Sequence, residues 1–119
     1  MKVLLDHHAS VNAHDHNGNT ALIFASGKGY PDIVQVLLSH GADVNQQNHI
    51  GITALMTAAL NKRVQIVKKL LLSKAVIDLK NSDGKTALLF AEEKKYTEIA
   101  GLIKDFQKNY TQPEKGTSK

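Results

Sequence analysis

Three histidines are the residues of this chain most suited to binding a metal ion. His14 and His16 are one residue apart, and His49 follows His16 by 33 positions. Imidazoles on neighbouring loops could converge on Zn²⁺. The chain has no cysteine, and no carboxylate completes an obvious ligand set. We therefore predict solvated loop histidines, with no metal centre and no cofactor; an interface that responds to pH is the milder alternative.

A carboxylate beside these histidines raises the question of catalysis. Asp15 lies between two imidazoles, an arrangement that could support acid–base chemistry. The positions 33 and 66 residues later hold Asn48 and Asn81, so hydrogen bonding within a turn explains this position better. Residues 27–29, Gly-Lys-Gly, resemble part of a phosphate-binding loop but lack its full spacing, so we predict a turn between two helices there. Because no nucleophile, base and orienting group form a recognisable set, we predict that the chain is not an enzyme.

Three copies of the phrase G-x-T-A-L divide the chain at a constant interval. They begin at Gly18, Gly51 and Gly84, so successive copies are 33 residues apart. A fixed period of this length indicates stacked units, each a small supersecondary element, rather than a core assembled from distant segments.

Local signals within each period predict a pair of short helices. In the most complete copy, Thr20 follows turn-forming residues and suits the N-cap of a first helix. Pro31 suits the first turn of a second helix, which Gly41 ends. The next copy has Lys62 and Lys74 where the first has glycines. If both lysines adopt left-handed conformations, each costs about 1–2 kcal/mol relative to glycine.

These units predict one repeat domain over residues 1–109. Its parts are a half repeat at 1–14 and repeats at 15–47, 48–80 and 81–109. Lys104 takes a position that is leucine in the two preceding units, as expected of a terminal unit whose outer face meets solvent. Residues 110–119 are polar and include Pro113, so we predict a disordered tail there.

Composition and charge narrow the class of protein further. The apolar run after Met1 ends at Asp6, too early for a signal peptide, and no run is long enough to span a membrane. An intracellular protein, cytoplasmic or nuclear, is therefore expected. The net charge is +4, and residues 61–119 hold 13 basic and 7 acidic side chains. Glutamates interrupt this basic half and no aromatic series accompanies it, which favours a solvated face over nucleic-acid or membrane binding.

The repeated units resemble the ankyrin-repeat family over essentially all of residues 1–109. Besides the three G-x-T-A-L copies, the motifs that carry the resemblance are Ile33-Val34 with Leu37-Leu38, Ile66-Val67 with Leu70-Leu71, and Gly41-Ala42-Asp43-Val44-Asn45. The resemblance implies an all-α solenoid of stacked antiparallel helix pairs with projecting β-hairpin-like loops, and a non-enzymatic function in protein binding. One departure is that the histidine of the family's T-P-L-H tetrad is replaced by Ile23, Met56 and Leu89.

The same resemblance implies contact positions on a concave face, formed by the loop tips and the inner face of each first helix. Carried onto this chain, the predicted contact residues are His16, Asn17, Asn19, His49, Ile50, Ile52, Leu60, Asn61, Asp83 and Lys85. Ile50, Ile52 and Leu60 are apolar where the last unit has charged residues. We predict that these three form the hydrophobic centre of a protein-binding site. Burial of each side chain against the partner would contribute about 1.5–3 kcal/mol to binding. Packing of the three on one another across the loops is the alternative.

Two further hypotheses concern assembly. A monomer is expected, but the half repeat leaves an apolar edge at Val3 and Leu4 through which two copies could associate. The chain could also be a regulatory or targeting part of a larger multidomain protein or secreted effector, with its activity elsewhere. Coding sequence upstream of Met1 would distinguish that from an independent binding module. Resemblance at the level of the fold does not identify the partner.

Overall fold

The computed structural model describes the backbone of residues 11–118 and the side chains of residues 11–107. The helices of this part of the chain are α2 (Ala21–Lys28), α3 (Pro31–Ser39), α4 (Ala54–Leu60), α5 (Val64–Leu72), α6 (Ala87–Glu93) and α7 (Thr97–Ser118).

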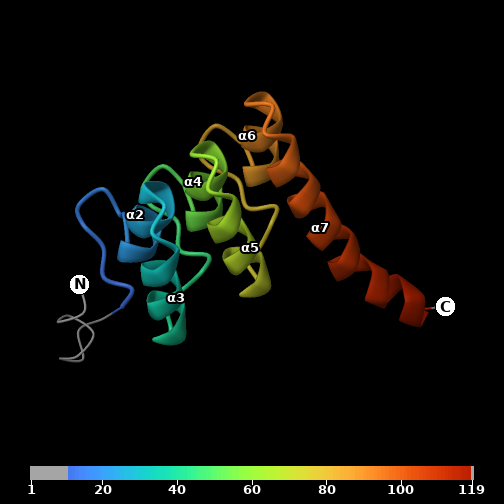
Figure 1. The fold of residues 1–119 in the computed structure, drawn as a ribbon, viewed down its shortest axis with the longest axis horizontal. Helices are drawn as coiled ribbons and strands as arrows, with labels where there is room; N and C mark the ends of the chain where they lie inside the picture. Colours follow the sequence, from blue (N-terminus) through green and yellow to red (C-terminus); the bar gives the residue numbers. More distant parts are fainter. Residues whose placement is uncertain (1–10, 119) are drawn as a thin grey trace.

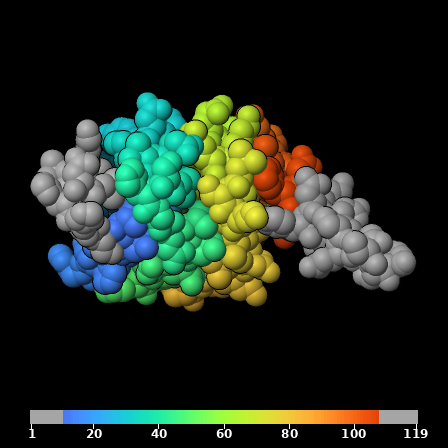
Figure 2. All heavy atoms as spheres, turned by 90° about the horizontal axis from the view of Figure 1, so that it is seen from below, coloured from blue at the N-terminus to red at the C-terminus, as the bar shows by residue number. Residues whose placement is uncertain are grey.

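The helices form two rows (Figure 1). Helices α2, α4 and α6 pack side by side in one row, α3, α5 and α7 pack in the other, and the two helices of each unit pack against each other. The units follow one another in chain order along the molecule (Figure 2). This arrangement confirms the predicted all-α solenoid of stacked helix pairs.

Each helix of the first row begins at the threonine of the repeated phrase. Thr20, Thr53 and Thr86 have extended backbones, and each side-chain oxygen accepts a hydrogen bond from the amide three residues later. The N to Oγ1 distances are 3.2 Å for Ile23, 3.2 Å for Met56 and 3.1 Å for Leu89. Each bond satisfies an amide that has no partner within the helix and contributes about 1 kcal/mol. The predicted capping role of Thr20 is confirmed.

Aliphatic side chains fill the space between the rows. Val34 of α3 and its equivalent Val67 of α5 are fully buried, as are Leu70 of α5 and Ile103 of α7. The residues that replace the family's histidine are not uniform. Ile23 and Met56 are buried, whereas Leu89 is 37% exposed. The apolar replacements therefore enlarge the core in the first two units but less so in the last.

Asparagine side chains tie the ends of successive units together. The Oδ1 atom of Asn12 accepts a hydrogen bond from the amide of Asp43 at 2.6 Å. One period later, Asn45 accepts from the amide of Val76 at 2.7 Å. These bonds satisfy backbone amides that lie outside any helix, so they fix the spacing of the segments that follow α3 and α5.

Three lysines occupy left-handed backbone conformations. Lys62 has a φ of 59°, Lys74 of 69° and Lys95 of 62°, so the left-handed conformation considered for the first two occurs in both and also at Lys95. Lys62 and Lys95 stand one and two periods after Gly29, which has a φ of 81°. The turn therefore keeps its left-handed backbone conformation where lysine replaces the preferred glycine, at a cost in backbone energy.

The last unit presents a polar outer surface. Lys104 is exposed and pairs with Glu92 at 3.2 Å, consistent with its predicted role facing solvent. Helix α7 is assigned as far as Ser118, but side chains beyond Gln107 lie outside the described residues, and the disordered tail at 110–119 stays a prediction. The apolar edge at Val3 and Leu4 also lies outside the described residues.

Exchanging the residues of one turn position between units should change stability in opposite directions. We expect Lys74→Gly to raise the free energy of unfolding by about 1 kcal/mol, because glycine adopts a positive φ without strain. The reverse change at the equivalent position, Gly41→Lys, should lower it by a similar amount, since Gly41 has a φ of 90°. Urea unfolding followed by circular dichroism measures both. Destabilisation by Lys74→Gly would contradict this account of the turn.

Candidate functional site

The loops before α2, α4 and α6 are three copies of one hydrogen-bonded turn. In each loop, a side-chain oxygen accepts hydrogen bonds from the backbone amides two and four residues later. The acceptors and donors are Asp15 with Asn17 and Asn19, Asn48 with Ile50 and Ile52, and Asn81 with Asp83 and Lys85, all at 2.9–3.0 Å. The neutral side chains of Asn48 and Asn81 accept the same hydrogen bonds as Asp15 does. Hydrogen bonding within the turn therefore explains Asp15 without an acid–base role.

We call these loops the fingers, and neighbouring fingers bond directly to each other. The amide of His49 donates to the carbonyl of Asn17 at 3.0 Å, and one period later Ser82 donates to Ile50 at 2.9 Å. A Cβ atom on Gly18 would lie 2.7 Å from the His49 ring. Glycine is therefore required in this finger both for its φ of 83° and for the close approach of the next one.

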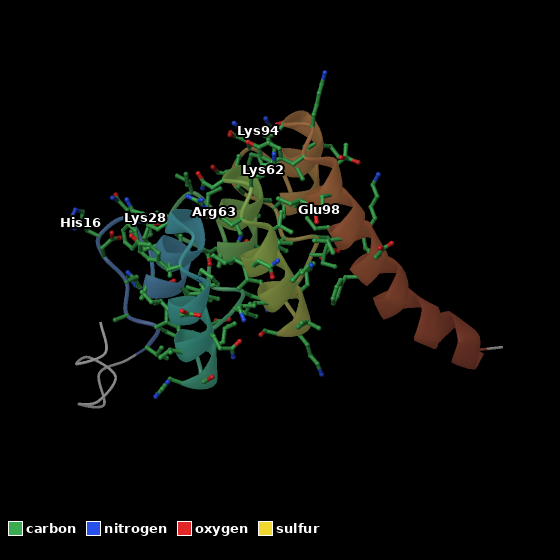
Figure 3. The ribbon with its side chains drawn as sticks, in the orientation of Figure 1. His16, Lys28, Lys62, Arg63, Lys94 and Glu98 are labelled. Atoms are coloured by element: carbon green, nitrogen blue, oxygen red, sulfur yellow. The ribbon has the colours of Figure 1, made fainter. Side chains whose placement is uncertain are left out.

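The histidines lie on the fingers, as predicted. The rings of His14 and His49 meet edge to face with centroids 6.1 Å apart, while His16 is exposed at the first finger tip (Figure 3). The Nδ1 atom of His14 lies 2.9 Å from the carbonyl oxygen of Asp15. Among the described residues, no group of three histidine or acidic side chains is placed to hold a metal ion.

A groove of about 370 Å³ runs between α2 and α4 beside the fingers. We call it the α2–α4 groove, and it is lined by Asn19, Ile23, Phe24, Gly27, Lys28, Asn48, Ile52, Thr57 and Asn61. Its lining combines apolar side chains with carboxamides and a single lysine. Such a mixture suits a ligand that is itself amphipathic, as a protein segment is.

The groove depends on a glycine inside α2. A Cβ atom on Gly27 would lie 2.7 Å from Cγ2 of Thr57, so this residue allows α2 and α4 to approach closely. The sequence placed Gly27 in the turn, but it belongs to the helix. The Nδ2 atom of Asn61 donates to the carbonyl of Thr57 at 2.8 Å, and Phe24 remains 49% exposed. The floor of the groove is thus narrow and its aromatic wall is open to solvent.

The structure distributes the predicted contact residues over the groove and the fingers. Asn19, Ile52 and Asn61 line the α2–α4 groove. The exposed residues at the finger tips are His16, Asn17, His49, Ile50 and Asp83. Lys85 pairs with Glu93 at 3.2 Å, and Leu60 is half-buried at the end of α4.

The three apolar residues proposed as a hydrophobic centre have different surroundings. Ile52 and Leu60 are half-buried and pack against the core, whereas Ile50 is 57% exposed. The fold therefore accounts for part of the apolar character of Ile52 and Leu60. Ile50 has no comparable structural reason, which makes it the member most readily available to a partner.

Phe24 is the groove residue that the sequence analysis did not single out. It lies within the predicted first helix and lines the groove. Its equivalents are Thr57 and Phe90, and this alternation between aromatic and polar residues was the available signal that the position is not core. Phe90 differs from Phe24 in being only 9% exposed, with the amine of Lys85 5.9 Å from its ring centroid.

Comparison with known protein families agrees with this architecture. Two family models match the chain: one described as ankyrin repeats (3 copies), over residues 1–48, and one described as ankyrin repeats (many copies), over residues 28–71. The chain belongs to the ankyrin-repeat family. Ankyrin repeats are generally protein–protein interaction modules. A search of curated proteins finds no match to this ankyrin-repeat chain, and no helix within its described residues is long and apolar enough to cross a membrane.

The side-chain acceptor of the first finger is an ionisable carboxylate, whereas the acceptors of the other two fingers are amides. The hydrogen bond from the Asn19 amide lowers the pKa of Asp15 below its ordinary value, with smaller contributions from the Asn17 amide and the charge of His16, against an opposing effect of burial. A lowered folded-state pKa stabilises the protein above the unfolded-state pKa, near 4, and this stabilisation is lost as the pH falls through the folded-state pKa.

We therefore expect Asp15→Asn to reduce the loss of stability between about pH 5 and pH 2.5. The amide would accept the same backbone hydrogen bonds as Asn48 and Asn81, so stability at neutral pH should change little. Urea unfolding midpoints at several pH values test this. An equal loss of stability in both proteins on acidification would contradict it.

Proposed function

We propose that this chain is a non-enzymatic module that binds a partner protein through the α2–α4 groove and the adjoining finger tips. The observation that carries the proposal is the exposure of two large apolar side chains, Phe24 at 49% and Ile50 at 57%. They belong to the wall of the groove and to the finger that leads into it. Aromatic and aliphatic anchors surrounded by polar groups are typical of the energetically important centres of protein interfaces.

The groove supports this proposal through its shape and its chemistry. A volume of about 370 Å³ accommodates an apolar side chain of the partner between Phe24 and Ile52. Burying such a side chain contributes about 1.5–3 kcal/mol, enough to make it a principal contact. The half-buried Ile52 gives the floor a firm apolar surface because it also packs against the core.

The rim of the groove suits the polar backbone that accompanies such a side chain. Nδ2 of Asn48 donates to Oδ1 of Asn19 at 2.8 Å, which orients both carboxamides. A carboxamide both donates and accepts hydrogen bonds. Asn19, Asn48 and Asn61 therefore provide partners for the amides and carbonyls of an extended peptide segment, and Lys28 adds one positive charge at the edge.

Exposed apolar residues allow a test that does not disturb the core. We expect the double variant Phe24→Ser and Ile50→Ser to lose at least tenfold in affinity for captured partners, because it removes both anchors. Its thermal midpoint should stay close to that of the unmodified chain, since Phe24 is 49% and Ile50 57% exposed and neither side chain belongs to the buried core. Pull-down from cells that express the chain, followed by mass spectrometry, identifies the proteins that are lost.

Leu72→Ser is the matched control. Leu72 lies on α5, outside the α2–α4 groove, and is 71% exposed, so the substitution removes a similar apolar side chain from another surface. Capture should be unchanged in this variant. Retention of the same proteins by the Phe24 and Ile50 variant, or their equal loss on changing Leu72, would contradict the proposed site.

A further inference from the structure

A second surface lies at the opposite ends of α2, α4 and α6 from the fingers. The turns that join the two helices of each unit contain five basic residues and no acidic one over residues 28–30, 61–63 and 94–96. We call this set the turn ridge, and it consists of Lys28, Lys62, Arg63, Lys94 and Lys95. Figure 3 shows Lys28, Arg63, Lys62 and Lys94 following one edge of the stack. The five basic residues of the ridge carry a charge of +5, which exceeds the net charge of the whole chain, +4.

No residue of the turn ridge forms an ion pair with another side chain in the described part of the chain. The ion pairs between described side chains join Lys85 to Glu93 and Lys104 to Glu92. Neither involves a residue of the ridge. Unpaired positive charges on neighbouring turns create a local positive potential that attracts an anionic ligand.

Two hollows separate the three turns. The first has a volume of about 230 Å³ and is lined by Gly29, Pro31, Arg63, Val64, Gln65 and Ile66. The second, of about 190 Å³, includes Lys62, Lys95, Tyr96, Thr97, Glu98 and Ile99. The second hollow also includes Val64, and a shift of 33 residues converts all six residues of the first set into members of the second. The stack therefore presents the same small hollow twice, one unit apart, with a basic group at each.

The guanidinium of Arg63 is held in place at the first hollow. Its Nε atom donates to the carbonyl oxygen of Gly27 at 3.0 Å, and a Cβ atom on Gly29 would lie 2.9 Å from Cζ. Glycine in the first turn therefore makes room for the guanidinium. A guanidinium that is already ordered binds a carboxylate with two hydrogen bonds at a reduced entropic cost.

Two lysines border the second hollow in strained conformations. Lys62 and Lys95 have φ values of 59° and 62° at the position that is Gly29 in the first turn. The amine of Lys62 lies 5.5 Å from the centroid of the Tyr96 ring. Tyr96 lines the second hollow, so this cation–π contact holds the amine beside it.

The spacing of the hollows indicates which anion fits. Neighbouring packed helices lie about 8–10 Å apart, and this sets the distance between equivalent hollows. A polyproline II segment has three residues per turn and rises about 3.1 Å per residue, so side chains three positions apart lie on one side about 9 Å apart. We propose that the turn ridge binds an extended acidic segment of a partner protein, with carboxylates at every third residue, one in each hollow.

The second hollow also contains a feature that favours spaced carboxylates over a continuous polyanion. Glu98 lines this hollow together with Lys62 and Lys95. Duplex DNA presents a negative charge every 1.7 Å or so along its axis, which would bring phosphates close to Glu98. A spaced peptide brings a single carboxylate into this hollow with neutral residues on either side, so it meets less of this repulsion than a duplex does.

Fluorescence anisotropy with two labelled peptides tests the proposal on the intact chain. One peptide repeats Glu-Pro-Pro four times; the other has the same composition with its four glutamates adjacent. The spaced peptide should bind at least about threefold more tightly and more weakly as salt is raised. The double variant Lys62→Gln and Lys95→Gln should weaken its binding about three- to tenfold, the range expected for two exposed ion pairs. Glu98→Gln should tighten it.

The matched control is Lys74→Gln with Lys80→Gln, which removes the same charge from outside the turn ridge. Lys74 also has a positive φ, 69°, so the control includes a comparable backbone position. Equal weakening by both lysine pairs would show an effect of net charge alone and overturn the proposal. Equal affinity for the two peptides, or tighter binding of a thymidine dodecamer or of phosphatidylserine vesicles than of the spaced peptide, would overturn it as well.

Discussion

The structure depends on the burial of each helix pair against the next one along the stack. A single pair of short helices has no partner for both of its apolar faces. Helix α4 packs against α2 on one side and α6 on the other, and Ala58 and Ala59 of α4 are fully buried. Small side chains at these positions allow close approach on both sides, so the spacing of the units is set here. The fingers and turns, which connect these helices, are therefore spaced at the same distance.

Because the helix pairs stack at this spacing, neighbouring fingers lie close enough to form hydrogen bonds and together make a continuous polar edge. Each finger closes on itself through one side-chain acceptor, as Asn48 does with the amides of Ile50 and Ile52. It then bonds to the next finger through its backbone. A Cβ atom on Gly51 would lie 2.7 Å from Cα of Asn81, just as one on Gly18 would meet His49. Glycine in the repeated phrase is thus a requirement of stacking as well as of the turn.

The two ends of the first-row helices offer different chemistry to partners. At the finger end, Phe24 and Ile50 combine apolar area with carboxamides, which suits a hydrophobic anchor with its backbone. At the turn end, Arg63 and the neighbouring lysines combine charge with small hollows. The two surfaces meet at Lys28, which lines the α2–α4 groove and also belongs to the turn ridge. A protein that carries an apolar anchor and an acidic segment could engage both, which would raise its overall affinity through effective concentration.

The period, the fold class and the residues at which helices begin could be predicted from sequence because they depend on local chemistry repeated at a constant interval. Thr20 caps α2, Pro31 begins α3, and Lys62 adopts a positive φ, as the residue types and their repeat positions indicated. The groove could not be predicted in the same way. Phe24 and Leu60 are both apolar residues of first-row helices, and only the packing of α2 on α4 decided that the first is largely exposed and the second half-buried.

The amino-acid sequence by itself therefore determined which elements form and in what order they stack. Capping, turn bonding and aliphatic periodicity act over a few residues, and the 33-residue interval repeats them. Only the tertiary structure decided which side chains remain available to partners. Exposure depends on residues one period away, as Gly27 shows by admitting Thr57 beside it and Gly29 by making room for Arg63. Such contacts between units have no signature within a single unit, because they arise from the distance at which neighbouring helices pack.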